Sequence, residues 1–143
     1  MARRVPWHSL SGATDSWFKM AITLNHTIVP ARDKVAAARF FAGIFGLDFK
    51  ELSGHFAPVH VNETLTLLFS EDATFDSHHY AFHVSDAEFD AILGRIKTAG
   101  LSYGSAPWIL DDGKINDWDG GRGFYFKDPN GHVLELMTVP QGG

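Results

Sequence analysis

Among the eight histidines and seventeen acidic residues of this sequence, His26, His79 and Glu135 are the candidates for a divalent-metal site, because the two histidines occupy equivalent places in an internal repeat and strand alternation turns Glu135 toward them. Two neutral imidazoles and one carboxylate form a three-ligand set that leaves coordination positions open for a substrate. The chain has no cysteine, which excludes thiolate metal sites, disulfides and a cysteine nucleophile. We therefore predict a metal site at these three residues. Such ligands accept Fe, Mn, Zn, Ni or Co, so the sequence does not identify the metal.

Strand alternation places the carboxylate of this set in a cleft. Glu135 lies between two leucines in a β-prone run over residues 132–139, so its side chain points away from theirs. A carboxylate there is costly to desolvate unless a positive group receives it, and a metal held with the two histidines is one solution. The alternative is that both histidines are half-buried strand residues and that Glu135 forms a salt bridge with Arg122 or Lys127.

Two further side chains are candidate catalytic residues. Tyr125 alternates with two phenylalanines, which places its phenol on the face of Glu135. A positioned phenol can donate a hydrogen bond to developing negative charge, whereas cleft packing is the alternative role. His83 follows His79 by four residues, which places both on the same face of a strand. It either carries a proton near neutral pH or acts as a hydrogen-bonded neighbour of the ligands, and we favour the second role.

The loop from Pro107 to Arg122 has the length and composition of a segment that covers a substrate. It carries two tryptophans, an asparagine and three glycines. A mobile surface loop is the alternative. The predicted substrate-binding residues in it are Trp108, Asn116, Trp118 and Arg122.

One internal repeat, at a spacing of 53 to 54 residues, indicates which elements position these side chains. Residues 24–47 parallel residues 77–101, and each begins with a histidine-bearing extended run followed by an amphipathic helix. The first helix begins near Asp33 and ends at Gly46. At the start of the second helix, Ser85 and Glu88 match a capping box. Its buried stripe is predicted to be Phe89, Ile92, Leu93 and Ile96.

Short β-prone runs follow each helix, so the predicted order is βαβββ twice. We predict an α+β fold in which the paired modules, at about residues 20–70 and 77–140, form a curled mixed sheet around a cleft. In the third strand of the first module, alternation places His60 with Pro58 and Phe56 on one face. The runs are residues 48–52, 56–61 and 65–69 in the first module and 102–103, 123–127 and 132–139 in the second.

Length and charge limit the number of domains and the kinds of partner that this chain can have. The sequence accommodates one domain at residues 20–140, and residues 1–19 match no periodic pattern, so we expect them to be an extension outside the core. The formal net charge of −5 with scattered basic residues argues against nucleic acid and anionic membranes as partners. Residues 1–19 also lack the apolar stretch of a signal peptide, so we expect a cytoplasmic protein.

Three segments of the sequence resemble the vicinal oxygen chelate superfamily, which includes glyoxalases, bleomycin-resistance proteins and extradiol dioxygenases. They are Leu24-Asn-His26, the run from His79 to Val84, and Gly123-Phe-Tyr-Phe-Lys-Asp-Pro-Asn-Gly-His-Val-Leu-Glu135. The resemblance covers about residues 21–140. It implies paired βαβββ modules, frequently completed in a homodimer, and metal ligands at His26, His79 and Glu135. His26 can then come from the same chain or from a partner chain.

Departures from the family patterns narrow the function. Glyoxalase I enzymes have a fourth ligand, a glutamate, where this chain offers Thr66 or Leu67, so four-ligand glyoxalase I chemistry is disfavoured. Extradiol enzymes use a histidine where this chain reads Asn116-Asp-Trp118, and fosfomycin-type transferases use basic residues after the last ligand, where this chain has none. We expect a metal-dependent enzyme, of the dioxygenase, isomerase or lyase, or transferase type, whose small substrate chelates the metal through neighbouring oxygens. The alternative is a metal-free protein that sequesters a small molecule, as bleomycin-resistance proteins do.

Overall fold

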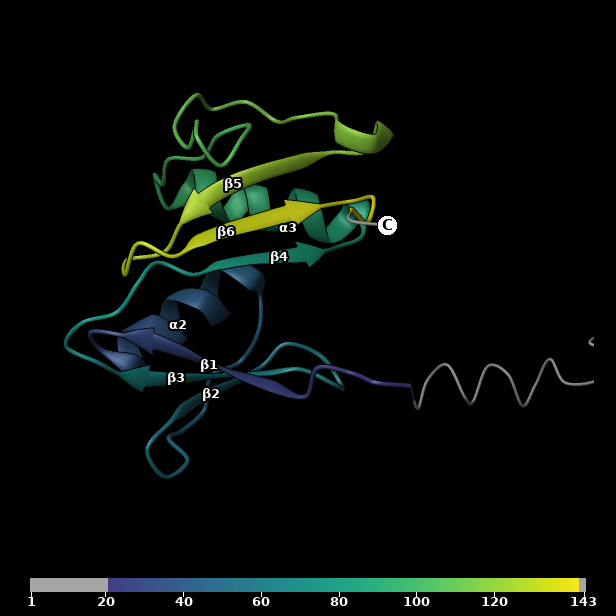
Figure 1. The fold of residues 1–143 in the computed structure, drawn as a ribbon. Helices are drawn as coiled ribbons and strands as arrows, with labels where there is room; N and C mark the ends of the chain where they lie inside the picture. The colour runs from purple at the N-terminus through teal and green to yellow at the C-terminus, as the bar shows by residue number, and fades with distance from the viewer. Residues whose placement is uncertain (1–20, 142–143) are drawn as a thin grey trace, which may run out of the picture.

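The computed structural model describes residues 21–141, and Figure 1 shows two similar halves, each with a helix packed on a small sheet. The prediction for residues 1–19 lies outside the described residues. Module 1 contains β1 (His26–Ala31), α2 (Lys34–Phe45), β2 (Ala57–His60) and β3 (Thr66–Glu71). Module 2 contains β4 (His79–His83), α3 (Asp86–Thr98), the short 3-10 helix η2 (Trp118–Gly120), β5 (Gly123–Lys127) and β6 (Val133–Met137).

The two sheets have the same topology. In module 1 the strand order is β1-β3-β2, and in module 2 it is β4-β6-β5. The central strand of each sheet is parallel to the module's first strand and antiparallel to its hairpin partner. The predicted α+β fold built from a repeated unit is therefore confirmed.

The strand predicted directly after each helix, the second strand of its module, does not form in the described residues. Within 48–52, Asp48, Lys50 and Glu51 are exposed, and the only pairing next to this run is the isolated bridge between Ser53 and Phe56. In module 2, Gly104 makes a single bridge to Tyr125, and the chain then folds back. Neither run has a strand beside it along its length in the chain, so β propensity alone does not make it a strand.

Both helices begin where the sequence predicts, and α2 also ends at its predicted residue. The Asp33 side chain accepts a hydrogen bond from the Ala36 amide at the start of α2, and Gly46 ends the helix in the left-handed conformation with φ of 71°. Ser85 and Glu88 form the predicted reciprocal capping box of α3. The buried face of α3 consists of the four predicted residues.

One hydrophobic core joins the two modules. Helix α2 lies between the two sheets (Figure 1), and its Phe41 and Phe45 rings lie 5.6 and 5.0 Å from the Phe82 ring of β4. Phe41 also packs on Phe69 of β3, within its own module. Because α2 contributes to both halves, the modules are not independent units.

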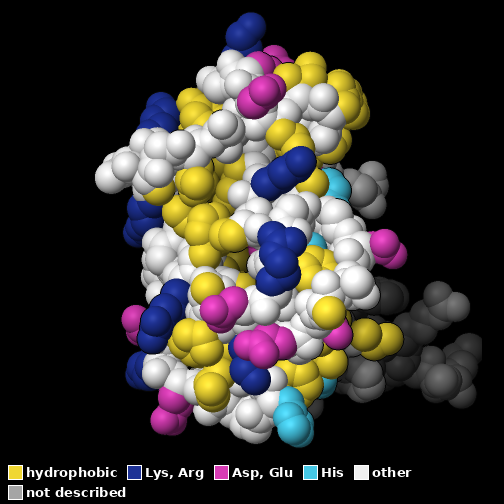
Figure 2. Space-filling view, turned by 90° about the vertical axis from the view of Figure 1, so that its left-hand side faces the viewer, with side chains coloured by type: hydrophobic (Ala, Val, Ile, Leu, Met, Phe, Trp, Pro, Cys, Tyr) yellow, Lys and Arg dark blue, Asp and Glu magenta, His cyan; other side chains and the backbone are white. Residues whose placement is uncertain are grey.

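The surface in Figure 2 has basic, acidic and hydrophobic side chains interspersed. This face has no continuous basic stripe of the kind that binds phosphate backbones. Among the described residues, no helix is long and apolar enough to span a membrane.

Candidate functional site

Strand β6 positions Glu135 at the centre of one sheet face. Its Cα partners are Ala81 on β4 and Tyr125 on β5, so the carboxylate lies between a small side chain and a phenol. Leu134 and Leu136 point to the opposite face and are buried in the core. The predicted alternation is therefore confirmed.

The Glu135 carboxylate is buried, and only one of its two oxygens has a hydrogen-bond partner. Its residue is 4% exposed, and Oε1 lies 3.0 Å from Nε2 of His79. Oε2 is buried and has no hydrogen-bond partner. An unpartnered carboxylate oxygen is costly in the protein interior, so this oxygen and the neighbouring imidazole suit a cation. The side chain of His79 is 46% exposed, so an ion can reach the pair from one side.

The alternative in which Arg122 neutralises Glu135 is wrong. The Arg122 guanidinium pairs with Asp86 and Asp90 at 2.9 and 2.7 Å and lies 4.3 Å from the ring centre of Phe89. Phe89 belongs to α3, so Arg122 lies on the helix side of the sheet, away from Glu135. The predicted role of Arg122 in substrate binding has no geometric support in this chain. Lys127 forms no salt bridge with Glu135 either. Within the described residues, the side chain that pairs with Glu135 is His79.

Tyr125 is buried beside Glu135 and contacts His79. Its ring lies edge-on to the imidazole of His79, with ring centres 5.9 Å apart. Burial and the neighbouring Glu135 carboxylate raise the pKa of Tyr125 well above its ordinary value. The phenol therefore stays protonated at neutral pH and is available as a hydrogen-bond donor.

Two tryptophans continue the row of aromatic rings from Tyr125 to the exposed Trp108. The ring centre of Trp118 lies 5.9 Å from that of Tyr125, and Trp108 lies 6.4 Å beyond Trp118. Trp108 is 76% exposed, so its face is available to a ligand. The predicted substrate-binding tryptophans thus lie in a row of rings that begins at Tyr125, the neighbour of the candidate ligand His79.

Hydrogen bonds within the loop that carries these tryptophans stabilise its conformation. The Asp112 carboxylate accepts hydrogen bonds from the Ser105 amide, the Ser105 hydroxyl and the Lys114 amide. Asn116 donates to the Ser105 carbonyl and accepts from the Trp118 amide. The Asn116 amide group therefore holds the loop, and its predicted contact with substrate stays a prediction.

His83 lies further along β4, on the face of His79, and its Nε2 is 3.1 Å from the Thr138 carbonyl oxygen. This hydrogen bond fits the neighbouring, structural role that we favoured over proton transfer. A catalytic role for His83 stays a prediction.

His26 lies on the other sheet and does not join His79 and Glu135 within one chain. Between residues 21 and 141, no three histidine or acidic side chains converge closely enough to hold a metal. The Nδ1 of His26 is 2.7 Å from Oδ1 of Asn25. If Nδ1 carries the proton that Asn25 accepts, Nε2 is left with a free lone pair for a ligand. His79 and Glu135 thus form a pair of neighbouring candidate ligands, and His26 is a separate third candidate.

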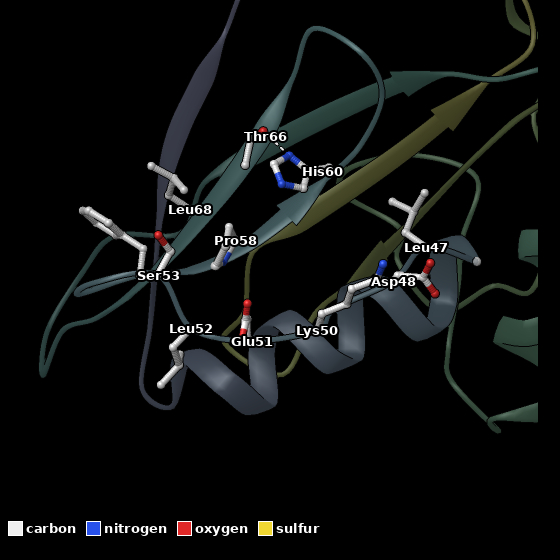
Figure 3. A pocket seen from close by; sticks show the side chains of 12 residues that line it. Leu47, Asp48, Lys50, Glu51, Leu52, Ser53, Pro58, His60, Thr66 and Leu68 are labelled. Atoms are coloured by element: carbon white, nitrogen blue, oxygen red, sulfur yellow. Dashed lines mark hydrogen bonds between the residues drawn. The ribbon is translucent and has the colours of Figure 1, made fainter.

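A hollow of about 910 Å³ lies against the sheet of module 1, on the side away from α2. The sheet residues that line it are Pro58, His60, Thr66 and Leu68, and Figure 3 shows them together with the segment that follows α2. The predicted alternation of Phe56, Pro58 and His60 is confirmed, because all three line the hollow.

The observed register corrects the expected position of a fourth metal ligand. Glu135 pairs with Ala81, two residues after His79, and Leu68 pairs with Ile28, two residues after His26. The repeat therefore places Leu68, not Thr66 or Leu67, at the position equivalent to Glu135. A leucine cannot bind a metal, so the absence of a fourth acidic ligand at this position holds in the corrected register.

His132, between the turn at 128–131 and β6, is a buried histidine that nothing in the local sequence marks as such. It is 0% exposed, its Nε2 lies 2.7 Å from the Pro30 carbonyl oxygen, and its Nδ1 accepts from the His78 amide at 2.9 Å. The bond to Pro30 ties the residue before β6 of module 2 to β1 of module 1, and the bond from His78 lies within module 2. The turn residues before it suggested exposure, and only the tertiary structure shows the carbonyl that it binds.

Comparisons with known proteins agree with this architecture. Residues 23–136 match the family model described as Glyoxalase/Bleomycin resistance protein/Dioxygenase superfamily. The solved structure of oxidase ChaP-H2 is 48% identical with a TM-score of 0.82, covering 87% of this chain and 98% of that chain. Oxidase ChaP-H1 is 47% identical with a TM-score of 0.81, covering 86% and 100%. Glutathione transferase FosA from Serratia marcescens is 28% identical over 124 residues, covering 82% of this chain and 81% of the relative. The matched residues include both modules.

Proposed function

Because the chain belongs to the glyoxalase/bleomycin resistance protein/dioxygenase superfamily, we propose that it is a metal-dependent oxidase. Its substrate would be a small molecule that binds the metal through two neighbouring oxygens, with dioxygen as the oxidant. The observation that carries a metal site is the buried Glu135 carboxylate, whose Oε2 has no partner and whose Oε1 lies beside His79. The similarity to two oxidases at 47% and 48% identity favours oxidation over isomerisation or group transfer.

We further propose a homodimer in which His26 of a second copy completes the ligand set. His79 and Glu135 offer one imidazole and one carboxylate, and the metal needs at least one more protein ligand for a three-ligand site. Within the described part of one chain no third histidine or acidic group converges on them. His26 presents a free imidazole edge on an exposed sheet face, as the missing ligand should.

The chain's own residues would bind and shield the substrate. The bound metal would supply Lewis acidity, which stabilises negative charge on the substrate oxygens. Tyr125 is protonated and buried beside Glu135, so it would donate a hydrogen bond to an oxygen of the substrate. Trp118 and Trp108 would pack on the apolar part of the substrate and exclude water.

A metal-free binding protein is the second candidate, and the exposed Trp108 next to Trp118 favours it. Adjacent tryptophan rings can hold an aromatic or cationic compound without any metal. Metal content separates the two functions.

The test is metal analysis of purified protein supplied with Fe²⁺, Mn²⁺, Zn²⁺, Ni²⁺ or Co²⁺. We expect about one bound metal per chain in the wild type and a loss of at least tenfold in affinity in Glu135→Gln. Glu63→Gln removes an exposed carboxylate from module 1 and should bind metal normally. Oxygen uptake by the iron-loaded protein with a panel of small catechols and α-hydroxyketones then tests oxidation. Protein that binds aromatic compounds but no metal would favour the second candidate.

A further inference from the structure

His60 is the histidine that lines the hollow of module 1, and neither the metal site nor the core accounts for it. We propose that His60 hydrogen-bonds the end of the substrate that lies away from the metal and so determines substrate specificity. This inference rests on the proposed function, because it places the substrate between the metal and this side chain.

The sheet register aligns His60 with the candidate ligand His26. Thr66 of β3 is the Cα partner of His26 on one side and of His60 on the other. The three residues therefore form one row across the sheet, and all three point away from α2. Neighbouring strands lie about 4.8 Å apart, so the Cα atoms of the two histidines are separated by about 10 Å. A substrate of one ring with a polar substituent spans such a distance from a metal at His26.

Thr66 fixes the orientation of the His60 ring. The Thr66 hydroxyl oxygen lies 2.8 Å from Nδ1 of His60, as the dashed line in Figure 3 shows. Among the hydrogen bonds of residues 21–141, none involves Nε2 of His60, so this atom is available to a ligand. The Thr66 hydroxyl can donate to Nδ1 or accept from it; when it donates, the proton of the neutral ring is on Nε2, which can then donate to an acceptor on the substrate.

The surroundings of His60 suit a side chain that discriminates between substrates. Next to it on the sheet the hollow is lined by the apolar side chains of Pro58 and Leu68, and the charged residues of the hollow come from the segment at 48–51. A site that hydrogen-bonds a substrate group rejects analogues without that group more strongly than an apolar wall can. His60 thus offers a polar contact for the far end of a substrate beside two apolar side chains.

The experiment compares two metal-chelating probes on protein loaded with the metal that it binds. 4-Nitrocatechol has two neighbouring oxygens at one end and a hydrogen-bond acceptor at the other, whereas catechol has only the chelating end. We expect His60→Ala to weaken 4-nitrocatechol binding about tenfold and catechol binding less than about twofold, because one hydrogen bond is lost. Metal content should stay at the wild-type level. Thr66→Val should give a smaller loss of the same kind, and His60→Gln, which keeps a polar group, should restore part of the affinity.

The outcomes separate this inference from the proposed function. If the wild type binds metal and both probes, and His60→Ala binds both as the wild type does, His60 is not a specificity residue and the metal site still stands. If His60→Ala loses catechol and 4-nitrocatechol binding equally, the residue acts on the fold or the metal, and the inference is also overturned. If the wild type binds no metal, the proposed function fails, and this inference fails with it.

Discussion

At the scale of single residues, burial decides which titratable groups are unusual. Glu135 and Tyr125 are both almost fully buried on one sheet face, although neither is apolar. The sequence predicts this pair because strand alternation sets their faces, and it predicts His79 beside them through the repeat. It does not predict the buried His132, because a histidine after a turn has no local sign of the carbonyl that it will bind.

Tyr125 should show the electrostatic effect of Glu135 in its titration. In metal-free protein, the ultraviolet signal of its tyrosinate, obtained as wild type minus Tyr125→Phe, should appear well above the ordinary pKa of about 10. Glu135→Gln should lower the pKa of Tyr125, since it removes the negative charge that disfavours ionisation. Tyr103→Phe, which removes a phenol packed on Phe124, should leave that signal unchanged.

The raised pKa of Tyr125 also makes the free energy of unfolding depend on pH. A raised folded-state pKa means that the contribution of Tyr125 is fully present below about pH 10 and is lost as pH rises through the folded value. The free energy of unfolding, measured with urea, should therefore fall more steeply above pH 10 in the wild type than in Tyr125→Phe. Identical pH dependence in the two proteins would show that Tyr125 is not shielded as the structure describes.

At the scale of elements, caps and periodicity were informative, whereas isolated β propensity was not. Both helices occupy their predicted positions because Asp33, Gly46 and the Ser85–Glu88 box act locally. The runs at 48–52 and 102–103 have extended-favouring residues but lack a strand beside them, and that information is not local. The packing of the loop before β5 likewise depends on contacts distant in sequence.

The loop before β5 should be sensitive to one added methyl group. A Cβ at Gly104 would lie 1.9 Å from the Ile109 carbonyl oxygen, so Gly104→Ala must displace the loop and should lower the free energy of unfolding by about 1–3 kcal/mol. The near-ultraviolet circular dichroism of Trp118 and Tyr125 should change with it. Gly94→Ala is the control: its Cβ meets nothing within 4 Å on α3, and it should stabilise by up to about 1 kcal/mol.

At the scale of the whole molecule, the two modules share a core but divide the proposed ligands. Helix α2 packs against both sheets, and His132 bonds to the Pro30 carbonyl across the modules. His26 nevertheless stays apart from His79 and Glu135. The repeat in the sequence predicts equivalent positions for the two histidines, but equivalence within one chain is not proximity. Which chain supplies His26 is a property of the assembly, so the sequence left both arrangements open.

Mixed dimers test this division directly. His26→Ala and Glu135→Gln chains should each bind metal poorly alone, because each lacks one ligand at both sites of its dimer. When the two are co-expressed, a mixed dimer has one site with both defects and one intact site, in which His26 of the Glu135→Gln chain meets His79 and Glu135 of the other. Random pairing makes about half of the dimers mixed, so tight metal binding should return to about a quarter of the wild-type level.

Complementation distinguishes a shared site from a site within one chain. If His26 reached His79 and Glu135 of its own chain, every site in the mixed dimer would carry one defect and no tight binding would return. Co-expression of His26→Ala with His79→Ala should complement in the same way as the pair above. Co-expression of His79→Ala with Glu135→Gln should not complement, because His79 and Glu135 act from the same chain and every site of that mixed dimer lacks one of them. Recovery of tight binding in this pair would contradict that placement.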